Sequence, residues 1–318
     1  MKHAPRNGVE QVTFYRHKLS MRQRIGIDLG GTKTEIIVLG TDGVPMLRRR
    51  RPTPPGYDAS LRNIADLVAE TEQETGQQAT IGVGIPGCIS PATGLVKNAN
   101  STVLNGHPFD RDLAALLGRD VRVANDANCF ALSEASDGAA AGHDLVFGVI
   151  MGTGTGAGIV VRGQVLEGMH GLTGEFGHIP LPWPLPEELP FPHCWCGQTG
   201  CLELYLSGPG LARTCDGPNA KDATALSSRA ASGDQQAQAA LDRHADRLAR
   251  ALAVITNLLD PHCIVLGGGL SNMAHLYTEL PTRMRPYVFS DQLSPNIVKA
   301  KHGDSSGVRG AAWLWPAS

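Results

Sequence analysis

Three cysteines and one histidine in the middle of the chain are spaced as a set of metal ligands. His178, Cys194, Cys196 and Cys201 follow the pattern H-x15-C-x-C-x4-C. Three thiolates and one imidazole suit tetrahedral Zn²⁺, and four protein ligands leave no open position for a water nucleophile. The spacing therefore predicts a structural zinc site; the alternative is three unlinked thiols near an unrelated histidine. The other cysteines are isolated and are expected to be ordinary small side chains: Cys88, Cys129, Cys215 and Cys263.

Glycine-rich stretches at three places indicate contact between backbone and phosphate. Glycine leaves its N–H group accessible to an anion, and it accounts for 38 of the 318 residues. In the first stretch Thr32 adds a hydroxyl, Lys33 adds a charge, and Asp28 is placed to hold Mg²⁺ through water. Each stretch alone also fits an ordinary tight turn. The predicted nucleotide-binding residues are Gly26, Ile27, Asp28, Leu29, Gly30, Gly31, Thr32, Lys33, Gly152, Thr153, Gly154, Thr155, Gly156, Ala157, Gly158, Ile159, Gly267, Gly268 and Gly269.

Two common nucleotide motifs do not account for these glycines. The stretch from Gly152 loosely matches the dinucleotide-binding fingerprint, with Glu175 about 20 residues further on. That fingerprint must open a helix, whereas residues 159–163 continue as a strand and a turn. No lysine follows a glycine in this chain, which excludes the G-x-x-x-x-G-K-[ST] loop of P-loop NTPases. We therefore predict that the second stretch is a hairpin loop that offers N–H groups and hydroxyls to phosphate.

Acidic side chains near these stretches could transfer protons or bind hydroxyls. Asp126 follows a predicted strand and opens a predicted helix, so it either caps that helix or acts as a general base. As a base it would take the proton of a sugar hydroxyl that attacks the γ-phosphate of ATP. Glu175 and Glu203 lie close in sequence to the predicted zinc ligands. Clustered carboxylates suit a polyol, although each one alone is more often a surface acid.

Alternating strand and helix patterns must position these residues. A strand–turn–strand–turn–strand meander comes first, with Thr41-Asp42-Gly43 as a hairpin turn. Apolar residues at helical spacing, with Asp58 as the cap and Gly76 at the end, predict the first helix. The proline-rich segment 180–192 is predicted to be irregular. The predicted strands are 24–29, 35–39, 46–51, 80–85, 120–124, 145–151, 158–161 and 263–266, and the predicted helices are 58–76, 126–141, 235–259 and 308–315.

Composition excludes several classes of protein. The formal net charge is −2, which argues against a dedicated nucleic-acid binder, and the basic run 48–51 is interpreted as the exposed face of a strand end. The longest apolar run, 145–151, is far shorter than the about 18 residues that a membrane helix needs. Residues 1–20 are polar and lack the apolar core of a signal peptide, so we expect a flexible extension and a cytoplasmic protein.

These motifs in combination resemble the ROK family (repressor, open reading frame, kinase). They occur in family order from Met21 to the C-terminus, and residues 97–102 and 301–312 carry a closer resemblance to bacterial fructokinases and mannokinases. The N-acetylglucosamine kinases of the family share most of the motifs. The motifs are Asp28-x-Gly30-Gly31-Thr32-Lys33, Asn125-Asp126-Ala127-Asn128, Gly152-Thr153-Gly154, Gly174-Glu175-Phe176-Gly177-His178 and Cys194-x-Cys196-Gly197-x-x-Gly200-Cys201-Leu202-Glu203.

The resemblance implies an α/β, actin-like (ribonuclease H-like) ATPase fold with two domains around a nucleotide cleft and a small zinc-binding excursion. It implies a small N-terminal domain of residues 21–124 with 305–318. Residues 125–304 would form the larger C-terminal domain, with the zinc knot at 178–201.

The resemblance also implies an ATP:hexose 6-phosphotransferase that uses ATP, Mg²⁺ and structural Zn²⁺ and forms a homodimer. Asp126 would be the catalytic base, and Asn125, Glu175, His178 and Glu203 would contact the sugar. Fructose is the expected substrate, with mannose or glucose as further possibilities. The alternatives are an N-acetylglucosamine kinase and a sugar-responsive repressor. About twenty residues precede the first strand, too few for a three-helix DNA reader.

Overall fold

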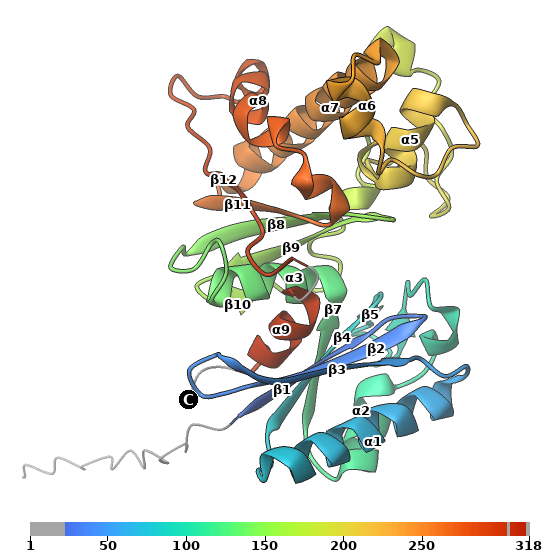
Figure 1. Cartoon of the computed structure of the whole chain (residues 1–318), viewed down its shortest axis with the longest axis vertical. Coiled ribbons are helices and arrows are strands. Elements are labelled where there is room, and N and C mark those ends of the chain that lie inside the picture. Colours follow the sequence, from blue (N-terminus) through green and yellow to red (C-terminus); the bar gives the residue numbers. More distant parts are fainter. Residues whose placement is uncertain (1–22, 304–305, 316–318) are drawn as a thin grey trace, which may run out of the picture.

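Two five-stranded sheets, each covered by helices, form the part of the chain that the structure describes (Figure 1). The structure is a computed structural model, and it describes residues 23–303 and 306–315. The predicted extension 1–20 lies outside the described residues. In the part of the chain that is described, no helix is long and apolar enough to cross a membrane.

The first sheet has the strand order β3-β2-β1-β4-β7. Its first three strands form the predicted antiparallel meander, while β4 and β7 continue the sheet parallel to β1. Helices α1 (Tyr57–Thr75) and α2 (Phe109–Leu117) cover one face, and α9 (Ser306–Trp313) covers the other (Figure 1). The strands are β1 (Arg24–Leu29), β2 (Lys33–Leu39), β3 (Pro45–Pro52), β4 (Thr80–Ile85) and β7 (Val121–Asn125).

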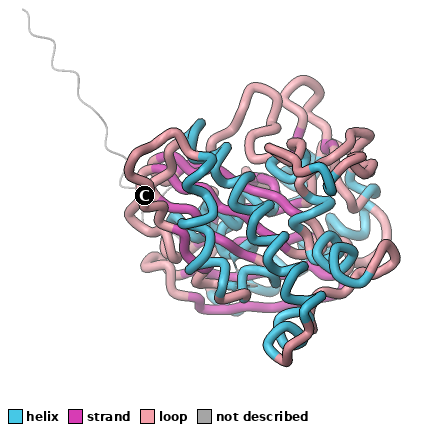
Figure 2. Tube along the Cα trace, turned by 90° about the horizontal axis from the view of Figure 1, so that it is seen from above, coloured by secondary structure: helices cyan, strands magenta, loops and turns pink. Residues whose placement is uncertain are grey.

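The second sheet has the strand order β10-β9-β8-β11-β12 and pairs a hairpin with two parallel strands. Helices α6 (Leu226–Ala231), α7 (Gln235–Leu259) and α8 (His275–Met284) lie on its outer face (Figures 1 and 2). Leu241, Leu248 and Leu252 of α7 are buried, so the predicted apolar stripe faces the core. The strands are β8 (Leu145–Met151), β9 (Thr155–Val161), β10 (Gln164–Val165), β11 (Cys263–Gly267) and β12 (Ile297–Lys299).

Helices α3 (Asp126–Ser136) and α9 lie between the two sheets and pack on each other (Figure 1). A Cβ atom on Gly310 of α9 would lie 1.6 Å from the Cys129 carbonyl oxygen of α3, so the helices can approach this closely only at glycine. Gly26 of β1 has the same role, since its Cβ would lie 2.0 Å from the Val308 carbonyl oxygen. We propose that the two domains, 21–124 with 305–318 and 125–304, meet at this helix pair.

Several predicted boundaries are wrong, and local capping explains two of them. Gly56, not Asp58, is the N-cap of α1, whereas Gly76 ends that helix in the left-handed conformation, as predicted. Asn125, not Asp126, caps α3, which ends at Ser136 rather than at residue 141. Helix α9 begins at residue 306 rather than 308, and β9 begins at Thr155 rather than at residue 158.

Short elements that the sequence patterns did not predict connect the larger ones. These elements include the two-stranded β5–β6 ribbon and the helices that follow the cysteine cluster. They are β5 (Cys88–Ile89), β6 (Val96–Lys97), η1 (Thr102–Leu104), η2 (Phe176–His178), η3 (Pro186–Glu188), α4 (Glu203–Leu206), α5 (Gly208–Asp216), η4 (Gly269–Asn272) and η5 (Arg285–Tyr287).

The basic run 48–51 lies on β3 with acidic partners. Arg48 and Arg50 both pair with the buried Glu35 of β2, and Arg51 pairs with Glu70 of α1. Their charge is therefore largely neutralised within the chain, as expected for the exposed face of a strand and not for a nucleic-acid patch.

Candidate functional site

A cavity of about 830 Å³ brings most of the predicted chemistry together. This volume lies within the range of small-molecule sites. The predicted residues that line the cavity are Asn125, Asp126, Gly152, Thr153, Gly154, Thr155, Gly156, Ala157, Glu175, His178, Cys196 and Glu203. Residues 26–33, 158–159 and 267–269 do not line it.

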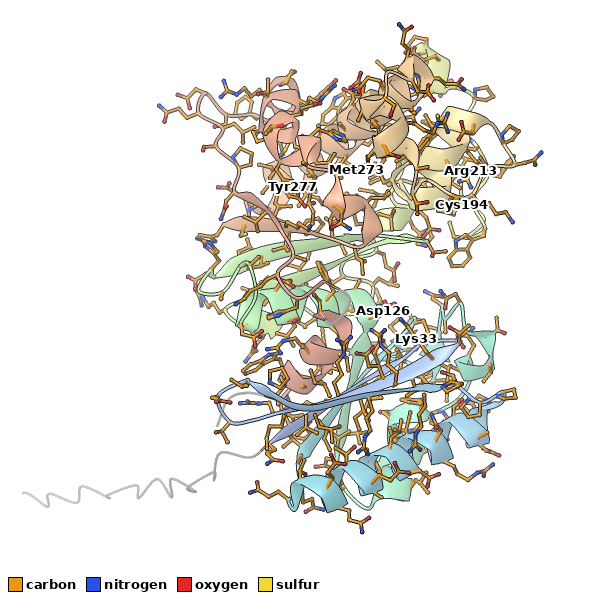
Figure 3. All side chains as sticks on the ribbon, viewed as in Figure 1. Lys33, Asp126, Cys194, Arg213, Met273 and Tyr277 are labelled. Atoms are coloured by element: carbon orange, nitrogen blue, oxygen red, sulfur yellow. The ribbon has the colours of Figure 1, made fainter. Side chains whose placement is uncertain are left out.

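Asp126 lies where β7 ends and α3 begins, facing the gap between the two sheets (Figure 3). Its Oδ1 atom accepts a hydrogen bond from the Ala127 N–H at 2.8 Å. Burial raises the pKa of Asp126; hydrogen bonds from Ala127 and Asn125 oppose this shift, and the charge of Glu175 adds to it. The side chain is nevertheless open to the cavity. A carboxyl group with these properties is suited to accept a proton from a bound hydroxyl.

Asn125 fixes the start of α3 beneath the cavity. Its Oδ1 atom accepts from the N–H groups of Ala127 and Asn128, at 2.9 and 3.4 Å, and its Nδ2 atom donates to the Gly87 carbonyl oxygen at 3.1 Å. The amide thereby links α3 to the loop after β4. The helix-capping role that the sequence left open for Asp126 thus belongs to Asn125, and Asp126 remains available for chemistry.

Asp28 lies on β1 of the first sheet, close enough to Asp126 of α3 to be affected by its charge. Burial raises the pKa of Asp28 to about 6, and the negative charges of Asp126 and Glu35 add to the shift. A buried carboxyl group whose pKa is raised by neighbouring carboxylates is stabilised in its ionised form by a nearby cation, so the donor type fits Mg²⁺. The turn after Asp28 is exposed at Gly31, Thr32 and Lys33.

The β8–β9 turn supplies the second predicted phosphate loop. Residues 152–154 form the turn, and a Cβ atom on Gly152 would meet nothing within 4 Å, so the backbone there is accessible. The Thr155 hydroxyl is buried, lines the cavity and has no hydrogen-bond partner among the described residues. A buried hydroxyl without a partner is costly, and a ligand or a water molecule in the cavity would satisfy it.

Other glycines of the predicted nucleotide stretches are used for packing. A Cβ atom on Gly158 would lie 2.7 Å from the Ala127 carbonyl oxygen of α3. One on Gly267 would lie 2.3 Å from the Phe130 ring, and one on Gly268 the same distance from the Met151 carbonyl oxygen. Only Gly269 of the third stretch has open space around it. Gly158 and Gly267 allow helix α3 to lie close to the second sheet, and Gly268 allows the chain after β11 to pass close to the end of β8.

The two glutamates of the site are held by local structure. Glu175 precedes η2, and Gly177 within η2 packs so tightly on β9 that a Cβ atom would lie 1.9 Å from the Thr155 carbonyl oxygen. Glu203 is the first residue of α4. Its Oε2 atom accepts from the Thr155 N–H at 3.1 Å, and its Oε1 atom accepts from Trp195 Nε1 at 2.7 Å.

The predicted zinc ligands converge on one point. The ligand atoms of His178, Cys194, Cys196 and Cys201 lie within 4.8 Å of one another. Cys196 Sγ and Cys201 Sγ are 3.6 Å apart, and Cys194 Sγ is 3.8 Å from His178 Nδ1. With Zn–S bonds of about 2.3 Å, tetrahedral geometry places two sulfurs about 3.8 Å apart. Both the donor types and their spacing therefore fit Zn²⁺.

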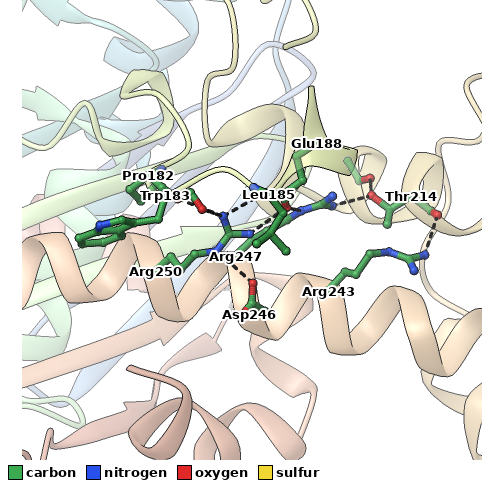
Figure 4. Close-up of polar contacts among 10 residues, drawn as sticks. Pro182, Trp183, Leu185, Glu188, Thr214, Arg243, Asp246, Arg247 and Arg250 are labelled. Atoms are coloured by element: carbon green, nitrogen blue, oxygen red, sulfur yellow. Dashed lines mark hydrogen bonds and ion pairs between the residues drawn. The ribbon is translucent and has the colours of Figure 1, made fainter. Parts of the chain in front are cut away.

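The proline-rich segment that leads into this cluster is tied to α7 (Figure 4). Glu188 accepts hydrogen bonds from Arg247 and Arg250, and Arg250 Nη1 also donates to the carbonyl oxygens of Pro182 and Trp183. All three charged side chains are buried. The segment lacks regular secondary structure over most of its length, so this polar network positions it.

Several cavity residues have no role in the sequence-based assignment. Asn98, Asn100 and Asn128 belong to motifs that carried the family resemblance, and Asn128 has a buried Oδ1 atom without a partner. Trp195 and Gln198 lie inside the cysteine cluster. The clustering of amides in these motifs was the available signal, but only the tertiary structure places them on one cavity.

A family model described as the ROK family matches residues 24–318. The chain belongs to the ROK family. It is 40% identical to the N-acetyl-D-glucosamine kinase of Yersinia enterocolitica over 296 residues, which cover 91% of this chain and 98% of that protein.

Two solved structures of the family are similar along nearly their whole length. One is a ROK hexokinase from Thermus thermophilus, with 31% identity, a TM-score of 0.80, and coverage of 92% of this chain and 97% of that chain. The other is a ROK family glucokinase from Streptomyces griseus in complex with glucose and AMPPNP, with 27% identity, a TM-score of 0.71, and coverage of 93% and 100%. The resemblance to a ROK-family sugar kinase and the actin-like fold that it implies are confirmed.

Proposed function

We propose that this ROK-family protein is an ATP-dependent N-acetyl-D-glucosamine kinase that phosphorylates the sugar 6-hydroxyl. The observation that carries the proposal is its 40% identity to the Yersinia enterocolitica kinase, over 91% of this chain and 98% of that protein. The motifs alone favour fructose, but identity along almost the whole of a relative outweighs two short stretches. A homodimer and the use of Mg²⁺ stay predictions of the family resemblance, and a cytoplasmic location stays a prediction from the sequence of residues 1–20.

The cavity offers both polar and apolar surface to such a sugar. Asn98, Asn100 and Gln198 present amides, which suit hydroxyls and an acetamido group. Leu172 and Trp195 line the same cavity with 45% and 68% of their surface exposed. Burial of a methyl group against such apolar surface is favourable by about 25 cal/mol per Å². The cavity lining thus supports a 2-acetamido sugar, because it offers side chains suited to both the amide and the methyl of that group.

In the proposed mechanism Asp126 accepts the proton of the 6-hydroxyl as that oxygen attacks the γ-phosphate. Its raised pKa brings the base closer to the working pH, which favours proton transfer. The N–H groups of Thr153 and Gly154 in the β8–β9 turn hold the transferred phosphate, because the Gly152 N–H already donates to the Gly154 carbonyl oxygen at 2.9 Å. The exposed residues 31–33 lie on the opposite sheet. Mg²⁺ bound with the nucleotide would neutralise phosphate charge next to Asp28.

His178 links the metal cluster to the sugar in this proposal. Its Nδ1 atom faces Cys194, which leaves Nε2 for the cavity that the residue lines. Zn²⁺ would supply only structural order, because its four ligands are all protein atoms. Glu175, Glu203 and the remaining amide hydrogen of Asn125 complete the proposed set of sugar contacts.

The test is a coupled ADP-release assay of the purified chain with N-acetylglucosamine, fructose, mannose and glucose. We expect the highest kcat/KM with N-acetylglucosamine, and a product in which NMR places the phosphate on O6. A higher kcat/KM with fructose would restore the fructokinase assignment. Absence of sugar-dependent ADP release with any of the four sugars would contradict the kinase proposal.

A further inference from the structure

Trp195 occupies an unusual place for a large aromatic residue. It stands between two proposed zinc ligands, Cys194 and Cys196, lines the cavity, and leaves 68% of its surface exposed. Its ring meets the His178 ring edge-on, with 5.1 Å between centroids and an angle of 85°. A side chain this exposed does not fill a hydrophobic core. The position of Trp195 is therefore explained by its specific contacts.

Its indole N–H reaches a carboxylate of the site. Trp195 Nε1 donates to Glu203 Oε1 at 2.7 Å, and the other oxygen of Glu203 accepts from the Thr155 N–H at 3.1 Å. Hydrogen bonds to a charged acceptor are about twice as strong as neutral ones. Glu203 is thus held at both oxygens, from the zinc loop on one side and from the start of β9 on the other.

Glycine at the β8–β9 turn makes this arrangement possible. A Cβ atom on Gly154 would lie 2.7 Å from Glu203 Oε2, so a larger residue there would displace the carboxylate. The Glu203 carboxylate therefore touches the predicted phosphate turn directly. Any shift of the carboxylate moves a group that both lines the proposed sugar cavity and contacts the phosphate turn.

We propose that Trp195 is a positioning residue that fixes the Glu203 carboxylate for sugar binding and couples the order of the zinc loop to the β8–β9 turn. The proposal rests on the proposed sugar-kinase function, but not on which hexose is the substrate. In this proposal the zinc loop affects sugar affinity through one hydrogen bond, from Trp195 to Glu203. No contact between the metal and the substrate is required.

The test compares W195F with the matched variant W183F. Phenylalanine at position 195 keeps an aromatic ring but removes the indole N–H together with one of the two fused rings. W183F removes the same groups on the preceding proline-rich segment, where Trp183 is exposed and does not line the cavity. For W195F we expect the sugar KM to rise about tenfold, as for the loss of one hydrogen bond to a charged group. The KM for ATP, the zinc content and the melting temperature should stay near wild type, as should all values for W183F.

An unchanged sugar KM in W195F would overturn the proposal, and so would equal losses of sugar affinity in W195F and W183F. The assay is run with whichever of the four hexoses the wild type phosphorylates, so a different preferred sugar contradicts the proposed function without affecting this test.

A second readout needs neither turnover nor a variant that folds well. Tryptophan emission of the wild type, titrated with sugar in the absence of ATP, should change on sugar binding because Trp195 borders the site. Chelation of zinc should change the same emission and weaken the sugar titration. Emission that responds to neither treatment would overturn the coupling.

Discussion

The guanidinium of Arg250 lies against both carboxylate oxygens of Glu188, with Nη2 2.8 Å from Oε1 and Nη1 3.0 Å from Oε2 (Figure 4). Arg247 Nε donates to Oε1 at 2.7 Å, and the Leu185 N–H donates to Oε2 at 2.8 Å. This buried network fixes the proline-rich segment that leads into the cysteine cluster to helix α7.

Removal of Glu188 should therefore destabilise the protein. E188A removes the carboxylate partner of the buried Arg247 and leaves the buried Arg250 with Asp246 alone, and breaking such a buried pair typically costs about 3–5 kcal/mol. Urea denaturation at pH 7 measures the free energy of unfolding. The control is E187A, because Glu187 is exposed beside it and its loss should change that free energy by less than about 0.5 kcal/mol. Equal stability of the two variants would show that the network contributes little.

The same carboxylate predicts a pH dependence. Burial alone would raise the pKa of Glu188, but hydrogen bonds from Arg250 and Arg247 outweigh it and hold the pKa at about 2. Because the folded pKa lies below the unfolded value of about 4.3, the stabilisation is complete above that pH and is lost as pH falls toward 2. Wild type should lose stability across this window more steeply than E188Q; parallel curves would contradict the assignment.

Asp28 should have the opposite effect on stability. Burial and the charges of Asp126 and Glu35 raise its pKa to about 6, so the folded state holds its proton more tightly than the unfolded chain. Ionisation above pH 6 therefore destabilises the fold. D28N should raise the free energy of unfolding at pH 8 by roughly 1–3 kcal/mol while abolishing turnover, and the gain should shrink as pH falls toward 4. The exposed D66N is the control, and a destabilised D28N would refute this account.

Asp126 should be required for turnover but not for sugar binding. D126N keeps an oxygen that can accept from the Ala127 N–H, so the start of α3 should remain intact. Loss of a general base typically costs about 10²–10⁴ in rate. ADP release measures kcat, and calorimetry with sugar alone measures binding. Near-normal kcat in D126N would remove this residue as the base.

Zinc removal should act on the sugar side of the cavity. Each chain should contain one zinc ion, measured by atomic absorption, and chelation should lower the melting temperature and raise the sugar KM more than the ATP KM. C201S should lose the metal, whereas C215S should keep it, because Cys215 is also buried but is not one of the four converging residues. A full complement of zinc in C201S would contradict the ligand set.

The contact between α3 and α9 should tolerate no side chain at Gly310. The Cβ atom of G310A would collide with the Cys129 backbone, and because backbone cannot rotate away, we expect a loss of more than about 3 kcal/mol. G307A on the same helix is the matched control, since its Cβ would lie 3.8 Å from the nearest atoms, which belong to Asp28. Similar melting temperatures for the two variants would refute the close approach.

Local patterns determined much of the secondary structure and the chemistry of this protein. The apolar stripe and Asp260 predicted α7 to the residue, and β1, β4 and β8 match their predicted bounds, because hydrophobic period and turn residues are short-range signals. The zinc donor set was equally local, since three of its four residues fall within 194–201. The general-base candidate Asp126 was visible at a strand–helix junction, although its neighbour Asn125 proved to be the cap.

Only the tertiary structure decided which residues share the cavity and what each glycine is for. Gly26, Gly158 and Gly267 look like phosphate-binding glycines in sequence, yet each is needed because another element approaches its Cα within contact distance. That approach involves elements that are distant in the sequence. Asn98, Trp195 and Glu203 likewise come from separate parts of the chain and meet only at the cavity. Sequence spacing determines local geometry. Packing between distant elements is decided only when the helices bury the apolar faces of both sheets.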